Sequence, residues 1–301
     1  MAQDFPVLGF IGLGVMGGPM CRNVVTKHPA AVHAFDMNAA ALAEAGRAGA
    51  KIAGSVTELA AVADIVLLSL PGGKQVHEVC FGEGGIAGAA RPGTIIIDLS
   101  TTSVADAQAA SARAEEAGLR FADAPVARTR EAAQAGTLSI MVGAEEALFA
   151  RIEPLLRYMG SDVTRCGEAG CGQVVKLINN TLLFEHVAAL AEMMVVAERA
   201  GVAPETLISA VSKGSGDSFA LRNHGLKAMA ARHFPERAFP AHYVLKDMGY
   251  CIELAENYGV APKLPQLVLQ YYREAVAQGI GDKYFPAIIE LIEKGSTHDE
   301  A

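Results

Sequence analysis

The sequence predicts an α/β domain with a mostly parallel sheet over residues 1–167, followed by an all-α domain over residues 168–301 that a long helix joins to it. Two observations support this prediction. In the first half, continuous apolar runs alternate with helical patterns, as in a parallel sheet covered by helices on both faces. From Gly172 onward, nearly every segment has helical periodicity instead. A length of 301 residues also fits about two domains.

Six apolar runs in the first half are candidate strands. They cover residues 7–11, 31–35, 64–70, 94–98, 121–126 and 138–142. The tripeptide Pro71-Gly72-Gly73 ends the third run, and Pro92-Gly93 introduces the fourth, as expected of turn residues. Helical stretches lie between most of these runs, which predicts parallel strands connected by helices.

The second half begins with a long apolar-rich pattern over residues 173–200 that contains no proline. The segment Gly201-Val202-Ala203-Pro204 ends this helix and begins the next one. Further helical patterns cover about residues 219–231, 242–258, 265–278 and 284–293.

Composition excludes several classes of function. About half of the residues are apolar and the formal net charge is −8, without a basic run, so we expect no nucleic-acid partner. The five cysteines are scattered and lack metal-type spacing, so we expect no metal site. The N-terminus does not resemble a signal peptide, and no stretch of 18 uncharged apolar residues is present. We therefore expect no membrane association and a cytoplasmic location.

The first strand is followed directly by a glycine-rich run. Gly12, Gly14 and Gly17 fit the Gly-x-Gly-x-x-Gly fingerprint of Rossmann-type dinucleotide-binding domains, in its proper setting between a strand and a helix. Gly12 permits the tight turn, Gly14 leaves room for the pyrophosphate, and Gly17 lets helix and strand pack closely. The predicted cofactor loop also includes the residues between these glycines, which are Leu13, Val15 and Met16.

Asp36 at the end of the second candidate strand indicates which dinucleotide binds. A carboxylate there can accept hydrogen bonds from the adenine ribose hydroxyls, and it would repel a 2′-phosphate. The next residues, Met37 and Asn38, supply no arginine to hold such a phosphate. The sequence therefore favours NAD over NADP.

The start of the long helix carries the candidate catalytic group. Gly172, Lys176 and Asn180 are spaced four apart and share one helix face, and Asn179 lies beside them. A lysine and two amides in an otherwise apolar helix are costly unless they serve a polar site. A lysine ammonium can give a proton to an alkoxide oxygen as a carbonyl is reduced. Asn180 can then hold the hydroxyl or steady the ammonium.

With these residues in place, the chain resembles the β-hydroxyacid dehydrogenases, the family of 3-hydroxyisobutyrate dehydrogenase and tartronate semialdehyde reductase. The resemblance covers nearly the whole chain and consists of several motifs in the same order. These are the 12–17 run with Met20 and Asn23, Asp98-Leu99-Ser100-Thr101, Asp123-Ala124-Pro125-Val126, Gly136-Thr137-Leu138, the run from Gly170 to Asn180, and Phe239 with Lys246-Asp247.

This resemblance implies a set of roles. Lys176 would be the catalytic residue, and Asn180, with Asn179 beside it, would bind the substrate. The cofactor would be contacted by Leu70, Pro71, Thr101 and Lys246, and Thr101 would also lie near the substrate. Members of the family form homodimers or homotetramers around the helical domain, so the same is expected here.

One segment departs from the family pattern. Most members have Ser-Gly-Gly after the Asp-x-Pro-Val run, whereas this chain has Ala127-Arg128-Thr129. An arginine fork with a hydroxyl is a stronger clamp for an anionic group. The Arg-Thr pair is similar to that of 3-sulfolactaldehyde reductases, which bind a sulfonate. Arg128 and Thr129 are therefore candidate substrate ligands, although Arg130 is an alternative and Arg128 as a solvent-facing loop residue is another.

Three functions compete at this point. The first is hydride transfer between NAD and a short anionic β-hydroxy acid or semialdehyde, such as 3-sulfolactaldehyde, with 3-hydroxyisobutyrate and tartronate semialdehyde as alternative substrates. The others are an imine reductase and a non-catalytic dinucleotide-binding module on the same fold. Members of those two groups lack the lysine, so the presence of Lys176 with Asn180 favours the first.

Overall fold

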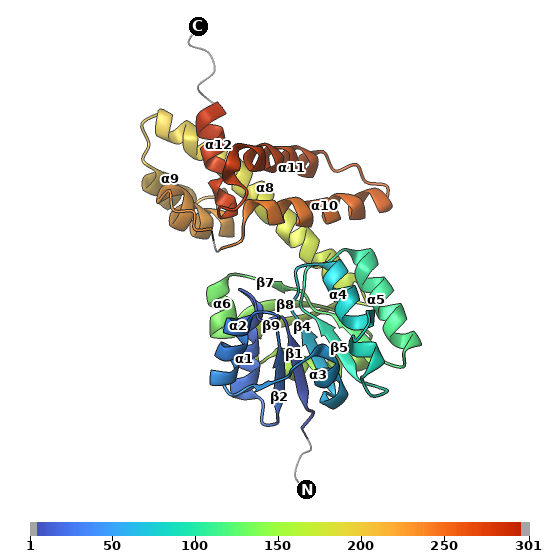
Figure 1. Cartoon of the computed structure of the whole chain (residues 1–301). Helices are drawn as coiled ribbons and strands as arrows, with labels where there is room; N and C mark the ends of the chain where they lie inside the picture. Colours follow the sequence, from blue (N-terminus) through green and yellow to red (C-terminus); the bar gives the residue numbers. More distant parts are fainter. Residues whose placement is uncertain (1–4, 237, 296–301) are drawn as a thin grey trace. The chain divides into compact units, whose positions relative to one another are not determined.

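The computed structural model describes residues 5–236 and 238–295. It divides into two compact units, Met1–Lys176 and Leu177–Ala301, which we call unit 1 and unit 2. The division falls inside the long helix α8 (Cys171–Arg199), whereas the sequence placed the domain boundary at residue 167, ahead of that helix. Figure 1 shows a sheet flanked by helices in unit 1 and helices alone in unit 2.

Within its described residues, unit 1 contains one nine-stranded sheet in the order β3-β2-β1-β4-β5-β6-β8-β7, with β9 paired to β8. The strands are β1 (Leu8–Ile11), β2 (Val32–Phe35), β3 (Lys51–Ile52), β4 (Ile65–Leu68), β5 (Ile95–Asp98), β6 (Arg120–Asp123), β7 (Val126–Ala127), β8 (Leu138–Gly143) and β9 (Gly160–Gly167). The six strands from β3 to β6 along this order are parallel, while β8 runs antiparallel to β6 and β7. The predicted, mostly parallel sheet is confirmed.

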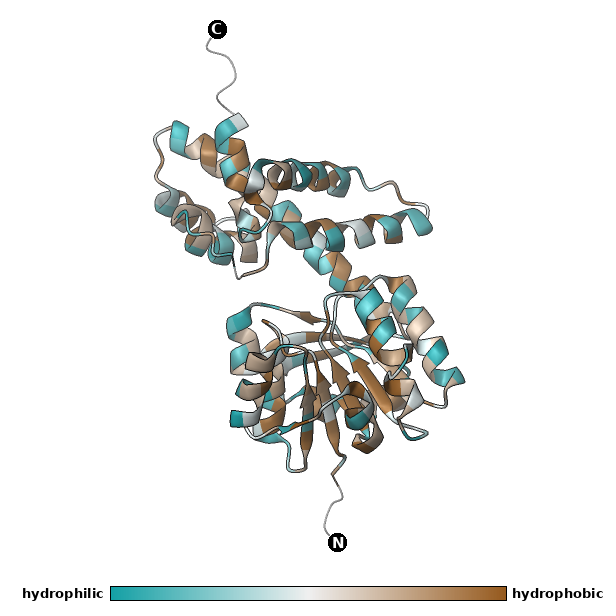
Figure 2. Cartoon of the chain, viewed as in Figure 1, coloured by the Kyte–Doolittle hydropathy of each residue, from teal (hydrophilic) through white to brown (hydrophobic). Residues whose placement is uncertain are grey.

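The central strands form because their side chains are apolar on both faces. Strands β1, β4 and β5 are buried at every position, and the central strands of the sheet are mostly brown in Figure 2. Phe10 and Leu67 enter the hydrophobic core on one face, whereas Ile11 and Leu68 enter the core on the other. The helices of unit 1 are α1 (Gly17–Lys27), α2 (Ala39–Arg47), α3 (Val56–Val62), α4 (Gly73–Phe81), η1 (Ile86–Gly88), α5 (Val104–Glu116), α6 (Arg130–Ala135) and α7 (Glu146–Leu156).

Unit 2 is all-α, as predicted. Besides most of α8, it contains α9 (Pro204–Val211), the π-helical η2 (Ala220–Ala230), α10 (Ala241–Asn257), α11 (Lys263–Ala275), η3 (Val276–Ile280), η4 (Phe285–Ala287) and α12 (Ile288–Gly295). Its core contains an aromatic cluster in which the Phe184 ring of α8 lies 5.9 Å from Phe239, 6.2 Å from Tyr272 and 5.3 Å from Phe285, centroid to centroid. These edge-to-face and tilted contacts fix α8 within the unit.

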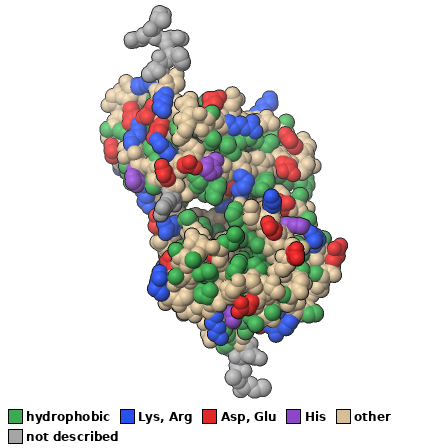
Figure 3. All heavy atoms as spheres, viewed as in Figure 1, with side chains coloured by type: hydrophobic (Ala, Val, Ile, Leu, Met, Phe, Trp, Pro, Cys, Tyr) green, Lys and Arg blue, Asp and Glu red, His purple; other side chains and the backbone are tan. Residues whose placement is uncertain are grey.

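Helix α8 is also apolar and long enough to cross a membrane, by length and composition alone. Its most apolar 18-residue window has a mean hydropathy of 1.3, and 44% of that window is buried inside the protein. Phe184, Val187 and Ala191 of this helix belong to the core of unit 2, and a core helix of a globular domain meets the same criterion. On the face seen in Figure 3, acidic and basic side chains are interspersed rather than gathered by sign.

Candidate functional site

The glycine run lies between β1 and α1, where the sequence placed it, and two of its glycines are required by the fold itself. Gly12 has a φ of +92°, and a Cβ there would lie 2.2 Å from the carbonyl oxygen of Ser69, which follows β4. A Cβ on Gly17 would lie 2.0 Å from the carbonyl oxygen of Gly12. Any side chain at either position would collide with backbone.

Gly14 differs from its two neighbours. A Cβ built on this residue would meet no protein atom within 4 Å, and its φ is outside the left-handed region. Packing within the chain therefore gives no reason for a glycine here. The open space beside it adjoins the first turn of α1, whose N–H groups can receive a phosphate. These residues fit the pyrophosphate of a dinucleotide.

The Asp36 carboxylate is fixed next to this loop. Its Oδ2 accepts a hydrogen bond from Leu13 N at 2.5 Å, and its Oδ1 accepts one from Asn38 N at 2.7 Å. The side chain of the following residue, Met37, is 96% exposed and fills no part of the surroundings. Asp36 thus presents a partly exposed carboxylate at the end of β2.

The other predicted cofactor residues of unit 1 lie at the same edge of the sheet. Strand β1 pairs with β2 on one side and β4 on the other, so the strand order reverses there, and such points are where open α/β sheets bind ligands. Leu70 and Pro71 follow β4, and Thr101 follows β5. Leu70 N donates to Ser100 Oγ at 2.9 Å, which ties these two loops together.

Arg128, a predicted substrate ligand, is occupied by protein acceptors. It has a φ of +87°, and its guanidinium donates to Thr137 O at 2.6 Å, Ser161 Oγ at 2.9 Å and Asp162 Oδ2 at 2.7 Å. Hydrogen bonds from Ser161 and Arg128 hold the pKa of the Asp162 carboxyl below its usual value. Thr129 precedes α6 and is half-buried.

The first turn of α8 is anchored by a buried carboxylate. Asp123 at the end of β6 is fully buried, and its Oδ1 accepts from Gly170 N at 2.7 Å while its Oδ2 accepts from Gln173 N at 2.8 Å. Burial raises the pKa of Asp123 to about 6, and the backbone hydrogen bonds oppose that rise. Asp123 and Gln173 belong to two of the family motifs, but the sequence alone assigns neither a role of its own. The one sequence signal for this contact is that a carboxylate, Asp123, ends a strand.

Lys176 follows on the same helix and is 8% exposed. A buried lysine amine is costly unless it has polar partners, so its position in this helix is compatible with a polar site. Asn180, one turn further along α8, is also buried.

In unit 2, a short polar network orients the two amides. Asn179 Nδ2 donates to Asn180 Oδ1 at 3.1 Å, and Asn180 Nδ2 donates to Asp247 Oδ2 at 2.7 Å. Asp247 is almost fully buried, and its Oδ1 lies 3.1 Å from Lys246 Nζ. Asp247 therefore joins Asn180 to Lys246.

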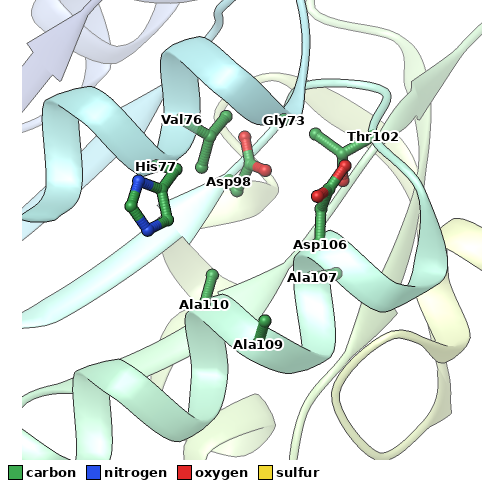
Figure 4. Close-up of a pocket in the computed structure, with 9 residues that line it drawn as sticks. All are labelled: Gly73, Val76, His77, Asp98, Thr102, Asp106, Ala107, Ala109 and Ala110. Carbon is green, nitrogen blue, oxygen red and sulfur yellow. The ribbon is translucent and has the colours of Figure 1, made fainter.

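A cavity of about 40 Å³ lies between α4 and α5, next to the loop that follows β5. Figure 4 shows His77 entering from α4, Asp98 from β5 and Asp106 from α5. A volume of this size holds a few water molecules and no substrate. This cavity is therefore too small to be the substrate site.

Comparison with known proteins matches nearly the whole chain. Residues 7–167 match a family model described as the NAD-binding domain of 6-phosphogluconate dehydrogenase. Residues 170–292 match one described as the NAD-binding domain of NADP-dependent 3-hydroxyisobutyrate dehydrogenase.

Individual relatives are similar over the same span. The chain is 36% identical to a 2-(hydroxymethyl)glutarate dehydrogenase of Eubacterium barkeri, over 95% of both proteins. It is 31% identical to a 2-hydroxy-3-oxopropionate reductase of Escherichia coli (strain K12), over 97% of this chain and 98% of the relative. A solved Mycobacterium tuberculosis 3-hydroxyisobutyrate dehydrogenase with L-serine is 32% identical, with a TM-score of 0.86 over 96% of this chain and 99% of that one.

Proposed function

Because this chain belongs to the β-hydroxyacid dehydrogenase family and is therefore a nicotinamide-dinucleotide-dependent oxidoreductase, we propose that it interconverts a short anionic β-hydroxy acid and its semialdehyde. The observation that carries the proposal is Lys176, a buried lysine on α8, with Asn180 one turn away on the same helix. Neither an imine reductase nor a non-catalytic dinucleotide-binding module needs this lysine.

In the proposed reaction, the nicotinamide supplies or accepts the hydride when it is bound. Lys176 gives a proton to the alkoxide oxygen during reduction and removes it from the hydroxyl during oxidation. Asn180, whose amide is oriented by Asn179 and Asp247, hydrogen-bonds the same hydroxyl. Because the Asn180 side chain is held on both sides, the substrate oxygen meets a preorganised partner.

We further propose NAD as the cofactor. The Asp36 carboxylate at the end of β2 can accept hydrogen bonds from both ribose hydroxyls, and it would repel a 2′-phosphate. The proposed set of cofactor contacts is completed by Leu13, Val15, Met16, Leu70, Pro71, Thr101 and Lys246.

For the substrate head group, we propose an anion held by Arg128 and Thr129. The Arg128–Asp162 ion pair is substantially exposed, and water screens exposed pairs strongly, so a doubly hydrogen-bonded anion can compete for the arginine. The relative named for 2-(hydroxymethyl)glutarate is consistent with a second acidic group on the substrate. A sulfonate, as in 3-sulfolactaldehyde, satisfies the same donors.

We also propose a homodimer or homotetramer in the cytoplasm. Ile178, Leu182, Met193 and Val196 are exposed apolar residues of α8, and their positions follow one helix face at a heptad-like spacing. An apolar stripe of this kind is typical of an interface between copies. Light scattering after size-exclusion chromatography measures the molar mass of the assembly. A monomer at micromolar concentration would contradict the proposed oligomer.

The test of the function is a turnover assay with purified protein. NADH oxidation is followed with 3-sulfolactaldehyde, methylmalonate semialdehyde, tartronate semialdehyde and succinate semialdehyde, and NAD reduction with the matching hydroxy acids. We expect one substrate to dominate. Lys176→Ala should lose turnover but still bind NADH, as measured by the change in NADH fluorescence on binding. Lys213→Ala, at an exposed position in unit 2, is the matched control and should keep full activity.

Two outcomes would contradict the proposal. If Lys176→Ala is as active as the parent, the lysine is not the proton carrier. If no aldehyde is reduced, reduction of a cyclic imine would identify an imine reductase, and NADH binding without any turnover would identify a non-catalytic module.

A further inference from the structure

The helix that carries Lys176 begins in an unusual way, because its first turn is held by a side chain from a distant strand. Both oxygens of Asp123 accept backbone hydrogen bonds there, from Gly170 N at 2.7 Å and Gln173 N at 2.8 Å. These donors are 47 and 50 residues further along the chain. One fully buried carboxylate thus ties the end of β6 to the start of α8.

Two glycines lie against this carboxylate and leave the room that it occupies. A Cβ on Gly143 would lie 2.3 Å from Asp123 Oδ1, and a Cβ on Gly172 would lie 2.7 Å from Asp123 Oδ2. Glycines of β8 and α8 therefore enclose the carboxylate on two sides. A side chain at either glycine would take the place of the carboxylate.

Gln173 extends the connection to a third segment. Its Nε2 donates to Ser100 O at 2.8 Å, and its Oε1 accepts from Thr102 N at 3.2 Å. These two hydrogen bonds flank Thr101, and Gln173 itself is fully buried. The same residue that binds Asp123 through its backbone thus fixes the loop after β5 through its side chain.

We propose that Asp123 and Gln173 are positioning residues, which hold the first turn of α8 against the Thr101 loop so that Lys176 keeps a fixed place relative to that loop. This inference rests on the function proposed above. Lys176 lies three residues after Gln173, so any rotation or shift of the first turn is passed to it directly. A displacement of about 1 Å at a reacting group can lower a rate by about 100-fold.

The arrangement also predicts a pH dependence. Since burial raises the pKa of Asp123 to about 6, the carboxylate takes up a proton as the pH falls through that value and one N–H loses its acceptor. The elements packed around it carry these ionisable groups: Asp98 on β5, Asp162, Arg165 and Cys166 on β9, and, in the first two turns of α8, Cys171 and Lys176. Strand β8 carries none.

The test compares Asp123→Asn and Gln173→Met with the parent enzyme and Lys176→Ala. Asp123→Asn keeps the size but offers one acceptor where two are needed, and Gln173→Met removes both contacts to the Thr101 loop. We expect kcat to fall by about 10- to 100-fold in each, while the Kd for NADH changes by less than about threefold in Asp123→Asn, which keeps both contacts to the Thr101 loop. The parent should lose kcat below pH 6, whereas Asp123→Asn should be low throughout and lack that limb.

Ser55→Ala is the control for general loss of stability, because Ser55 caps α3 by accepting a hydrogen bond from Glu58 N at 3.0 Å. It should lower the Tm without changing kcat. If both test variants are folded and keep the parental kcat, or if their only effect is a lower Tm, the inference is wrong. If Asp123→Asn does not fold, Gln173→Met alone decides. An inactive parent would instead overturn the proposed function, and this inference with it.

Discussion

Replacing Gly14 by alanine adds one methyl group at a position where a Cβ would meet no protein atom within 4 Å. The folded protein should accept this change without strain. Alanine also restricts the unfolded chain, which stabilises a protein by about 0.4–1 kcal/mol when the native backbone suits the new residue. The Tm of Gly14→Ala should therefore equal that of the parent or exceed it slightly.

The same methyl group should interfere with the dinucleotide. It would project into the space assigned to the pyrophosphate, so the phosphates could no longer approach the backbone closely. We expect the Kd for NADH to rise at least tenfold, which corresponds to about 1.4 kcal/mol of binding free energy.

Gly12→Ala is the matched comparison because it should do the opposite. A side chain at a φ of +92° costs about 1–2 kcal/mol, and a Cβ 2.2 Å from Ser69 O adds an overpacking cost of about 1–3 kcal/mol. A total of about 2–5 kcal/mol lowers the Tm by roughly 4–20 °C for a unit of this size.

Thermal unfolding by circular dichroism and titration of NADH fluorescence measure the two effects separately. The reasoning predicts that Gly14→Ala loses binding without losing stability, and that Gly12→Ala loses stability first. If Gly14→Ala binds NADH as tightly as the parent, the glycine run does not hold the pyrophosphate and the cofactor site has been wrongly assigned.

Three further predictions follow from single side chains. Asp36→Ser should narrow the preference for NADH over NADPH, and an unchanged ratio of kcat/KM values would show that Asp36 does not select the cofactor. Asp247→Asn should destabilise the protein by about 1–3 kcal/mol in urea unfolding, because Lys246 loses its buried anionic partner. Burial, with a smaller contribution from Lys227, lowers the pKa of His224 from 6.5 to about 4, so this histidine is neutral in the folded protein at pH 7. Above pH 6.5 the histidine is neutral in both the folded and the unfolded protein. As the pH falls from 6.5 toward 4, only the unfolded chain takes up the proton, so the free energy of unfolding falls by about 3 kcal/mol. Urea unfolding at pH 7 and 4.5 measures this loss, which should be smaller in His224→Asn.

The central part of the fold could be predicted from sequence because burial on both faces leaves a continuous apolar run. Strands β1, β4 and β5 carry that signal, and all three were predicted within a few residues of their observed bounds. Strands β3 and β9 were missed, and the strand expected over 121–126 is two strands, β6 and β7, separated by Ala124-Pro125. Strand β3 is only two residues long and exposed, and β9 has one buried position and two register shifts against β8, so neither has an apolar run.

The candidate site was less accessible to sequence reasoning for a different reason. The glycine run and the Lys176–Asn180 spacing are local patterns, which a sequence displays directly. The partners of Arg128 are instead 9 to 34 residues away, and those of Asp123 are 47 and 50 residues away. Which acceptors meet a guanidinium or which amides meet a carboxylate depends on the register of β8 with β9 and of β6 with β5, and no local pattern encodes that.

The hydrogen bonds between Asp123 and the first turn of α8 determine where a recombinant fragment can end and where a protease can cleave. A recombinant fragment ending at residue 167 would retain Asp123 but lose Gly170 and Gln173, which leaves a carboxylate inside the domain with neither of these donors. A fragment extended to residue 180 would keep both donors and the two hydrogen bonds to the Thr101 loop. The shorter fragment should therefore aggregate on expression, and limited proteolysis of the intact protein should spare the peptide bonds between residues 167 and 173.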